Sequence, residues 1–278
     1  MIHTARQLKA LVRNQSGGNS AQAQVIIRNY VMERFLERIS LSRYKNNFIL
    51  KGGMLISAMV GIDNRSTMDI DTTIRNIPLT IDQAEYIINE IINVPLEDGI
   101  TFILQNMSEI MSEDEYTGVR VHMEAMLESM KTPLKIDIST GDVITPSEIT
   151  YKYKLMFENR EIAILAYNME TVLAEKLQTV LSRGTANTRL RDFYDIYILQ
   201  EKISSVDTDK FIAAFRATCQ RRNSGAVIAN SSKIIDSISD NKNLITLWQI
   251  YQKKFSYAAG ISWEMVMNAI RVLYDKTQ

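Results

Sequence analysis

Residues 48–74 read FILKGGMLISAMVGIDNRSTMDIDTTI, and this stretch organises the rest of the chain. Its last part, around Asp69 and Asp71, is rich in residues that favour strands. Because successive side chains of a strand point to opposite faces, both carboxylates project to the same side, about 7 Å apart. They repel each other unless a cation lies between them, and hard carboxylate oxygens suit Mg²⁺. The stretch predicts a metal-binding strand, with a solvated acidic sheet edge as the plainer alternative.

Two glycines lie where the first apolar run of this stretch ends. Gly52 and Gly53 follow Lys51 and precede a second apolar segment, as expected where a strand gives way to a helix. Glycine lets the backbone approach a ligand closely, and the free N–H groups at a helix start attract phosphate. A Gly-Gly phosphate cradle followed by a D-x-D metal pair resembles the site of DNA polymerase β-like nucleotidyltransferases.

Composition narrows the class of protein. The chain has 278 residues, of which 46% are hydrophobic and 23% charged, as in one large folded domain or two smaller ones. Its formal net charge is zero, so any basic surface for nucleic acid must be local. One cysteine, Cys219, excludes an internal disulfide, and two histidines argue against a zinc site or a Ser-His-Asp triad. No apolar run approaches the length of a membrane span, so we expect a cytoplasmic protein.

Alternating apolar and polar side chains predict two further strands, over residues 119–125 and 134–140. In the second strand Asp137 lies on the polar face, like the two carboxylates of the D-x-D pair. If these strands are neighbours, Asp137 supplies the third acid of the metal site. The alternative is a Lys135–Asp137 ion pair on a solvated face of the sheet.

The pattern changes to a helical period from Thr171 onward. Lys176 falls within the apolar arc of the first helix, where a lysine either extends to an edge or is held for a purpose such as reaching a triphosphate. Asp192 and Asp195 share one side of the next helix, residues 190–199, which is apolar almost all round and so predicted to be buried. Buried acids need partners, which are either nearby arginines or Lys176.

A local basic cluster lies between these two helices. Arg183, Arg189 and Arg191 crowd one turn and suit phosphate contacts of a nucleotide or an RNA, although a solvated loop is the plainer reading. Lys253 and Lys254, much later in the chain, offer polar contacts but indicate no particular function.

The two halves of the chain differ in their periodicity, which indicates an α+β fold. We predict that residues 1–165 form a polymerase β-like mixed sheet flanked by helices. We predict that residues 166–278 form a helical bundle that contributes Lys176 and Asp192 to the site. Residues 21–39 fit an amphipathic helix that packs on the sheet.

Four blocks of sequence, in order over residues 48–200, resemble the abortive-infection nucleotidyltransferase toxins of the AbiEii type. One departure is Met54 after the two glycines, where many polymerase β-like enzymes have Gly-Ser. The nearest hydroxyl is Ser57, so backbone N–H groups would have to hold the phosphates. The matching blocks are LKGG at 50–53 with RSTMDID at 65–71, LKIDISTGD at 134–142, ETVLAEKL at 170–177 and RDFYDIY at 191–197.

The resemblance implies the toxin half of a bacterial toxin–antitoxin pair, often linked to phage defence. Such a toxin transfers a nucleoside monophosphate from an NTP to an acceptor and releases pyrophosphate. For some relatives the acceptor is the 3′ end of tRNA, and this modification stops translation and growth. The partner would be a cognate antitoxin protein or an antitoxin enzyme.

The resemblance also implies roles for the residues of the first half. Asp69 and Asp71 would hold Mg²⁺ or Mn²⁺, with Asp137 as a third ligand that activates the attacking hydroxyl. Gly52 and Gly53 would cradle the phosphates.

Further roles fall on the cations and on the helix acids. Lys51 and Lys176 would neutralise charge on the triphosphate, and Asp192 is the helix acid expected to reach the site, with Asp195 in support. Arg65 would bind nucleotide and position the metal loop.

Thr67 is a candidate regulatory or supporting residue, because it lies two residues before Asp69. A phosphate on Thr67 would place a dianion beside the carboxylates and block metal or NTP binding.

Two other classes of function stay open. The first is an enzyme of the same fold that modifies a protein hydroxyl, which predicts label on protein and none on RNA. The second is a non-catalytic nucleotide-binding module. The D-x-D pair argues against the second, because a dead site has no reason to keep two repelling acids together.

Overall fold

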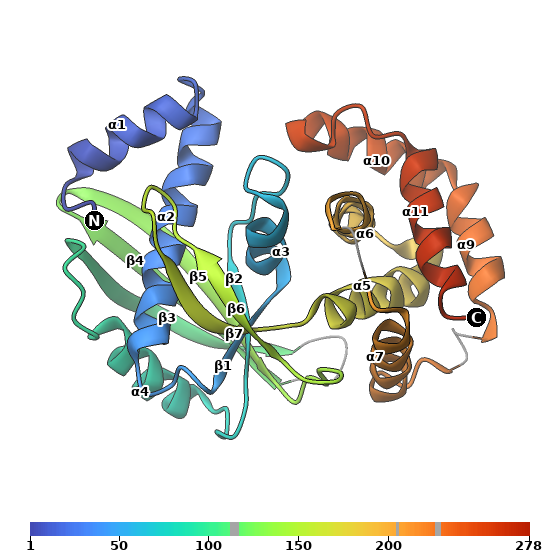
Figure 1. Ribbon diagram of the computed structural model, residues 1–278, viewed down its shortest axis with the longest axis horizontal. Helices are drawn as coiled ribbons and strands as arrows, with labels where there is room; N and C mark the ends of the chain where they lie inside the picture. The colour runs from blue at the N-terminus through green and yellow to red at the C-terminus, as the bar shows by residue number, and fades with distance from the viewer. Residues whose placement is uncertain (112–116, 204–205, 226–228) are drawn as a thin grey trace. The chain divides into compact units, whose positions relative to one another are not determined.

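The computed structural model describes residues 1–111, 117–203, 206–225 and 229–278. The chain splits into two compact units (Figure 1). Among the described residues, no helix has the length and apolar character needed to cross a membrane. The first unit holds Met1–Ala58, Ser66–Asp142 and Ile149–Ala166, and the second holds Met59–Arg65, Val143–Glu148 and Tyr167–Gln278.

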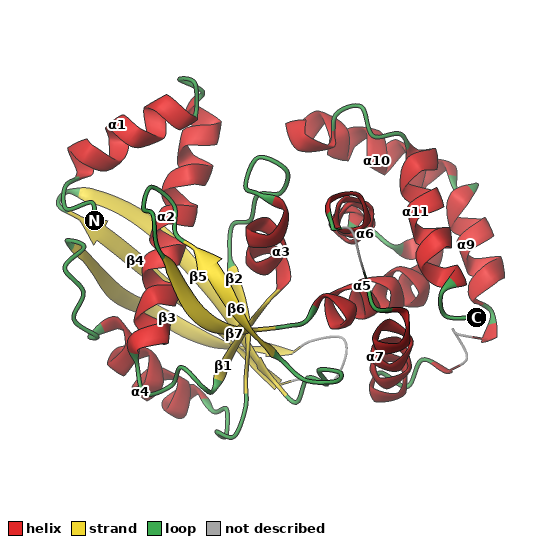
Figure 2. Ribbon diagram, viewed as in Figure 1, coloured by secondary structure: helices red, strands yellow, loops and turns green. Residues whose placement is uncertain are grey.

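A seven-stranded mixed sheet forms the first unit's centre, in the order β3-β4-β5-β2-β1-β7-β6 (Figure 2, yellow). β2 runs antiparallel to β1 and parallel to β5. The predicted fold class, a mixed sheet followed by a helical half, is confirmed. The strands are β1 (Phe48–Lys51), β2 (Ile70–Ile74), β3 (Ile100–Met111), β4 (Thr117–Leu127), β5 (Met130–Thr140), β6 (Ile149–Lys154) and β7 (Glu161–Ala166).

The alternation predicted for the central strands is present. In β5 the side chains of Leu134, Ile136 and Ile138 are buried, whereas Lys135 and Asp137 lie on the other face. This burial fixes the register, because a slip of one residue would expose every apolar side chain of the strand.

β6 and β7 have no counterpart among the strands expected from sequence. Within the described ranges, β6 lies at the sheet edge and pairs with β7 alone. Lys152 and Lys154 lie on it, and charged residues of this kind protect an exposed edge from pairing with another chain. The same lysines dilute the apolar alternation that would have revealed the strand.

At least two helices of the first unit begin at side-chain caps. Asn19 accepts hydrogen bonds from the backbone N–H groups of Ala21 and Gln22, and Thr80 accepts one from Gln83. The longest of them contacts β5 and β7, which places it across the sheet (Figure 1). The helices are α1 (Ala5–Gln15), α2 (Ser20–Leu41), α3 (Gly52–Val60) and α4 (Ile81–Ile92).

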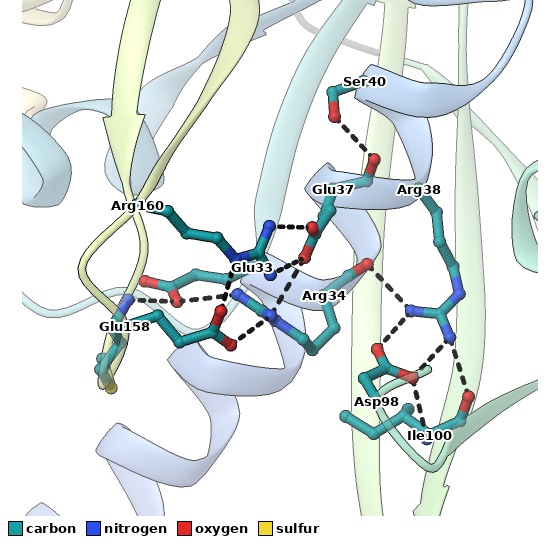
Figure 3. A network of polar contacts seen from close by, with 10 residues as sticks. Glu33, Arg34, Glu37, Arg38, Ser40, Asp98, Ile100, Glu158 and Arg160 are labelled. Carbon is teal, nitrogen blue, oxygen red and sulfur yellow. Dashed lines mark hydrogen bonds and ion pairs between the residues drawn. The ribbon is translucent and has the colours of Figure 1, made fainter. Parts of the chain in front are cut away.

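Helix α2 differs from the expected amphipathic helix, because its charged side is buried too. Figure 3 shows the polar contacts that this side makes. Arg38 forms a fork on Asp98, with N–O distances of 2.7 and 2.9 Å. Arg34 lies 3.0 Å from both Glu37 and Glu158. These groups, which we call the α2 network, are Glu33, Arg34, Glu37, Arg38, Asp98, Glu158 and Arg160.

The second unit is helical in its described residues, apart from loops. Its first long helix packs against the second and the third. The long helices are α5 (Met169–Arg183), α6 (Leu190–Lys202), α7 (Thr208–Arg221), α9 (Ser231–Ser239), α10 (Lys242–Lys254) and α11 (Trp263–Asp275). Short 3-10 turns lie at Gly184–Ala186 and Ser256–Ala258.

Candidate functional site

A row of ionisable residues crosses four neighbouring strands of the first unit. Lys51 on β1 is paired with Asp71 on β2, and Asp71 is paired with Asp137 on β5. Arg120 on β4 is paired with Asp137 from the other side. Residues paired across strands project to the same face. The row therefore reads cation, carboxylate, carboxylate, cation, with two acids as neighbours at its centre.

The carboxylate of Asp71 is the most constrained group of the row. Burial raises its pKa above the ordinary value, and Asp69 and Asp137 add to the rise, against the opposing influence of Lys51 and of a hydrogen bond from the backbone N–H of Gly53. A deprotonated Asp71 is therefore stabilised by any further positive charge that reaches it.

Gly52 is required by the closeness of Asp71. Its φ is +66°, and a Cβ at this position would lie 2.1 Å from Asp71 Oδ2. No other amino acid fits there without displacing the carboxylate. The two glycines expected to cradle phosphate thus have a second task, which is to let Asp71 lie against the start of α3.

Asp69 lies just before β2 and is held from two sides. Thr67 Oγ1 donates a hydrogen bond of 3.1 Å to Asp69 Oδ1, and Lys135 Nζ lies 2.8 Å from Asp69 Oδ2. The same ammonium is 3.6 Å from Asp137 Oδ2, so Lys135 bridges two of the three predicted metal ligands. Thr67 is only 1% exposed, so its hydroxyl supports Asp69 and would reach a kinase only after local opening.

Two residues that the sequence analysis did not select complete this group. Arg120 forks on Asp137 with two N–O distances of 2.8 Å. Asp142 lies 2.5 Å from Lys51 Nζ and accepts a hydrogen bond of 2.7 Å from Ser139. Burial acts to raise the pKa of Asp142, but Lys51 and Ser139 outweigh it and lower that pKa.

We call the whole set the strand cluster. Asp142 could have been selected from the sequence, because it lies inside one of the matching sequence blocks. Arg120 could not, because its pairing with Asp137 depends on strand order. The members are Lys51, Asp69, Asp71, Arg120, Lys135, Asp137 and Asp142.

The donor chemistry of the strand cluster fits a divalent cation of the Mg²⁺ type. Asp69, Asp71 and Asp137 offer hard oxygen atoms, and the raised pKa of Asp71 reflects a need for positive charge. Within the described part of the chain, no three acidic, histidine or cysteine side chains converge closely enough to form a ready metal site. In this structure the Lys135 ammonium lies between Asp69 and Asp137.

A second charged cluster lies within the second unit. Lys176 Nζ is 2.5 Å from Asp192 and 2.9 Å from Asp195. Arg65 donates to Asp195 over 2.7 and 3.3 Å, and Arg189 lies 3.0 Å from Asp192. Both helix acids therefore contact Lys176, and each also pairs with an arginine. The two kinds of partner that the sequence suggested for these acids, Lys176 and nearby arginines, are thus both present.

Electrostatics keeps this second cluster charged. Burial acts to raise the pKa of Asp195, but Arg65 and Lys176 outweigh it and lower that pKa to about 2. Burial acts to lower the pKa of Lys176, but Asp192 and Asp195 outweigh it and raise that pKa. Lys176 is thus a fixed ammonium ion at neutral pH. Its predicted part in the reaction, and that of Asp192, stays a prediction.

Solved structures share this fold at low sequence identity. JHP933 from Helicobacter pylori matches with a TM-score of 0.53 and 15% identity, over 91% of this chain and 93% of that chain. A candidate nucleotidyltransferase from the same species matches with a TM-score of 0.49 and 14% identity, over 91% and 96% of the two chains. No curated protein matches the sequence. The first of these similarities supports the fold and no more.

The family is shown by the sequence itself. Residues 34–269 match the family described as nucleotidyl transferase AbiEii toxin, type IV toxin–antitoxin system. This range contains the strand cluster and the Lys176 cluster, and it confirms the resemblance seen in the four sequence blocks. The chain belongs to the AbiEii family of nucleotidyltransferase toxins.

Proposed function

We propose that this protein transfers a nucleoside monophosphate from an NTP to an RNA acceptor, the 3′ end of tRNA, and so blocks translation in the bacterial cytoplasm. The observation that carries the proposal is the pair of adjacent carboxylates at the centre of the strand row, Asp71 and Asp137, with cations on both sides. Asp137 keeps 21% of its side-chain surface exposed, so a cation from solvent can reach this pair.

In this proposal Asp69, Asp71 and Asp137 hold Mg²⁺ or Mn²⁺. The bound ion would neutralise charge on the triphosphate and on the leaving pyrophosphate. Lys135 would give up its contacts with Asp69 and Asp137 to such an ion, and its ammonium would then face a phosphate.

The chain's own groups account for positioning and proton transfer. The acceptor hydroxyl oxygen bonds to the α-phosphorus of the NTP, and the bond from that phosphorus to the pyrophosphate oxygen breaks. Asp137, held in a fixed orientation by the Arg120 fork, accepts the proton that the hydroxyl loses. Lys51, held by Asp142, places positive charge beside Asp71 and at the start of α3, where the backbone of Gly52 and Gly53 is proposed to meet phosphate.

In the second unit we assign Lys176 as a cation for the negative charge of the substrate. Asp192 and Asp195 keep it ionised and in place, and Arg65 acts through Asp195 as a positioning residue. We propose this role for Arg65 because its guanidinium is only 3% exposed and is already committed to Asp195.

The test is incubation of purified protein with Mg²⁺, each α-labelled NTP in turn, and total bacterial RNA. We expect label in a tRNA-sized band with the wild type and with Asp82→Asn, an exposed control in α4, and none with Asp71→Asn. Label on protein alone would favour the protein-hydroxyl alternative. Absence of label with every NTP, despite nucleotide binding, would contradict the proposed transfer and favour a binding module.

The family also supplies the biological setting of the proposal. A type IV toxin–antitoxin system implies a cognate antitoxin as partner. We propose that the pair acts in phage defence, and co-expression with the cognate antitoxin should then relieve growth arrest.

A further inference from the structure

A patch on the second unit combines unpaired cations with a partly exposed aromatic stack. It joins the start of α6 to the end of α10, two segments about sixty residues apart in the sequence. We define the basic–aromatic patch as Arg189, Arg191, Lys253, Lys254, Phe255 and Tyr257.

The aromatic part of the patch is a stack that continues into the protein. The rings of Phe255 and Tyr257 have centroids 5.3 Å apart and an interplanar angle of 24°. Tyr257 in turn lies 4.9 Å from Tyr194, and Phe255 lies 4.7 Å from the buried Tyr251. Phe255 and Tyr257 are partly exposed at the outer end of this stack. The stack is therefore held by buried rings at its inner end and partly exposed at its outer end.

The cationic part of the patch lies directly over this stack. The Arg191 guanidinium carbon is 5.3 Å from the Phe255 ring centroid, and the Lys254 ammonium is 5.5 Å from it. Among the described residues, Arg191, Lys253 and Lys254 have no acidic partner. The sequence explains this, since residues 241–263 include three lysines and no aspartate or glutamate. Arg189, mostly exposed, adds a fourth cation whose charge is shared with Asp192.

This composition matches the needs of an unpaired nucleic-acid strand. Cations contact the phosphates, while aromatic rings and the flat guanidinium of arginine stack on bases without regard to sequence. A pocket for a small nucleotide buries most of its ligand, whereas this patch is an open surface formed by side chains at the ends of two helices. Such a surface suits a polymer better than a free NTP.

We infer that the basic–aromatic patch binds the single-stranded end of the RNA acceptor, with a base stacked against Phe255 and phosphates on Arg191, Lys253 and Lys254. This inference rests on the proposed function, since it names where that function's acceptor is held. The one arginine and two lysines without acidic partners are then the local basic surface that a chain of zero net charge needs in order to bind RNA.

The test is binding of a fluorescent single-stranded RNA to the full-length protein, without NTP, followed by anisotropy at several salt concentrations. Phe255→Leu should weaken binding about tenfold, as expected for the loss of one stacked base. Arg191→Gln and the Lys253→Gln/Lys254→Gln pair should weaken it and lower the dependence on salt by about one phosphate contact per cation removed.

Two matched variants control for charge and for folding. Lys242→Gln removes the same charge from the same helix, about 18 Å away along its axis, and should leave binding unchanged. Phe255→Tyr keeps the ring and should restore wild-type affinity, which separates stacking from a general loss of packing against Tyr251.

The outcomes separate this inference from the proposed function. If the patch variants bind RNA like the wild type, the inference is wrong, whether or not transfer occurs. If they lose RNA binding while the wild type labels no RNA, the patch stands and the transfer proposal fails. If they lose affinity for NTP and keep RNA, the patch holds the substrate base and the inference is overturned.

Discussion

The strand cluster and the α2 network belong to the same unit and contain the same charges in different surroundings. Among the described residues each has four carboxylates and three cations, so each has one acid in excess. In the α2 network the side chains of Arg34 and Asp98 are fully buried. In the strand cluster Asp69 and Asp137 keep 22% and 21% of their side-chain surface exposed.

We propose that the two clusters neutralise the excess acid by different means. In the α2 network it is Glu33, whose pKa burial raises to about 8, so that it holds a proton at neutral pH and the network becomes neutral. In the strand cluster it is Asp71, whose pKa is raised by burial and by two acidic neighbours. Asp69 and Asp137 leave this second cluster partly exposed, and we propose that a cation from solvent supplies its missing charge. In our proposal, accessibility to solvent, more than the number of charges, distinguishes the metal site from the structural network.

The largest expected effect is on catalysis. Asp71→Asn removes a central carboxylate of the proposed metal site. We expect transfer of label to RNA to fall by about a thousandfold or more, because this carboxylate is proposed to hold positive charge at the reacting centre. The same change relieves repulsion with Asp69 and Asp137, so the thermal midpoint should stay or rise. Calorimetry beside the transfer assay checks both. Wild-type activity in Asp71→Asn would reduce the strand cluster to a structural feature.

The next largest effect is on folding, in the other cluster. Arg38→Met leaves Asp98 buried without its partner, which should cost about 3–5 kcal/mol of unfolding free energy. Lys210→Met, which breaks the exposed Lys210–Asp207 pair, serves as control and should leave the denaturation midpoint unchanged. Equal midpoints for the two variants in urea would show that the α2 network is not the stabilising structure described above.

Glu33 predicts a pH dependence of stability. Its folded-state pKa of about 8 exceeds the ordinary value of 4.5, so the folded protein binds this proton more tightly than the unfolded chain. The stabilisation is complete below the ordinary pKa and is lost as the pH rises through 8, by about 1.4 kcal/mol per pH unit in between. Glu33→Gln should flatten this slope. The exposed control Glu85→Gln should keep it, and a slope unchanged in Glu33→Gln would contradict the assignment.

The smallest effect concerns Lys135. Its ammonium competes with a divalent ion for Asp69 and Asp137, so Lys135→Gln should tighten Mn²⁺ binding in the absence of nucleotide about fivefold. Lys131→Gln, on the same strand and paired with Glu124, is the matched control. Weaker Mn²⁺ binding in Lys135→Gln would mean that the lysine supports the ion instead of replacing it.

Periodicity was sufficient to predict the faces of single strands. The alternation in β5 placed Asp137 on the polar face, and the structure agrees. It could not reveal that β2 lies between β1 and β5, because strand order depends on the whole sheet. The pairing of Arg120 with Asp137 was therefore invisible in the sequence. The hold of Asp142 on Lys51 joins residues ninety-one apart and was equally hidden.

The burial of charged side chains was also not predictable from the sequence. Helix α2 reads as amphipathic, since Glu33, Arg34, Glu37 and Arg38 are charged, yet all four are buried. Their partners come from residues such as Asp98 and Glu158, far along the chain. The periodicity of a helix shows which of its residues are polar. It does not show which distant polar groups will pack against them.

The most direct test of the account is titration of Mn²⁺ into the protein without nucleotide, followed by electron paramagnetic resonance. We predict one saturable site in the wild type, its loss in Asp71→Asn, and its retention in Glu33→Gln, which alters the excess acid of the closed cluster. A wild type without a saturable site, or a site that survives in Asp71→Asn, would contradict the claim that the strand cluster takes its missing charge from a solvent cation.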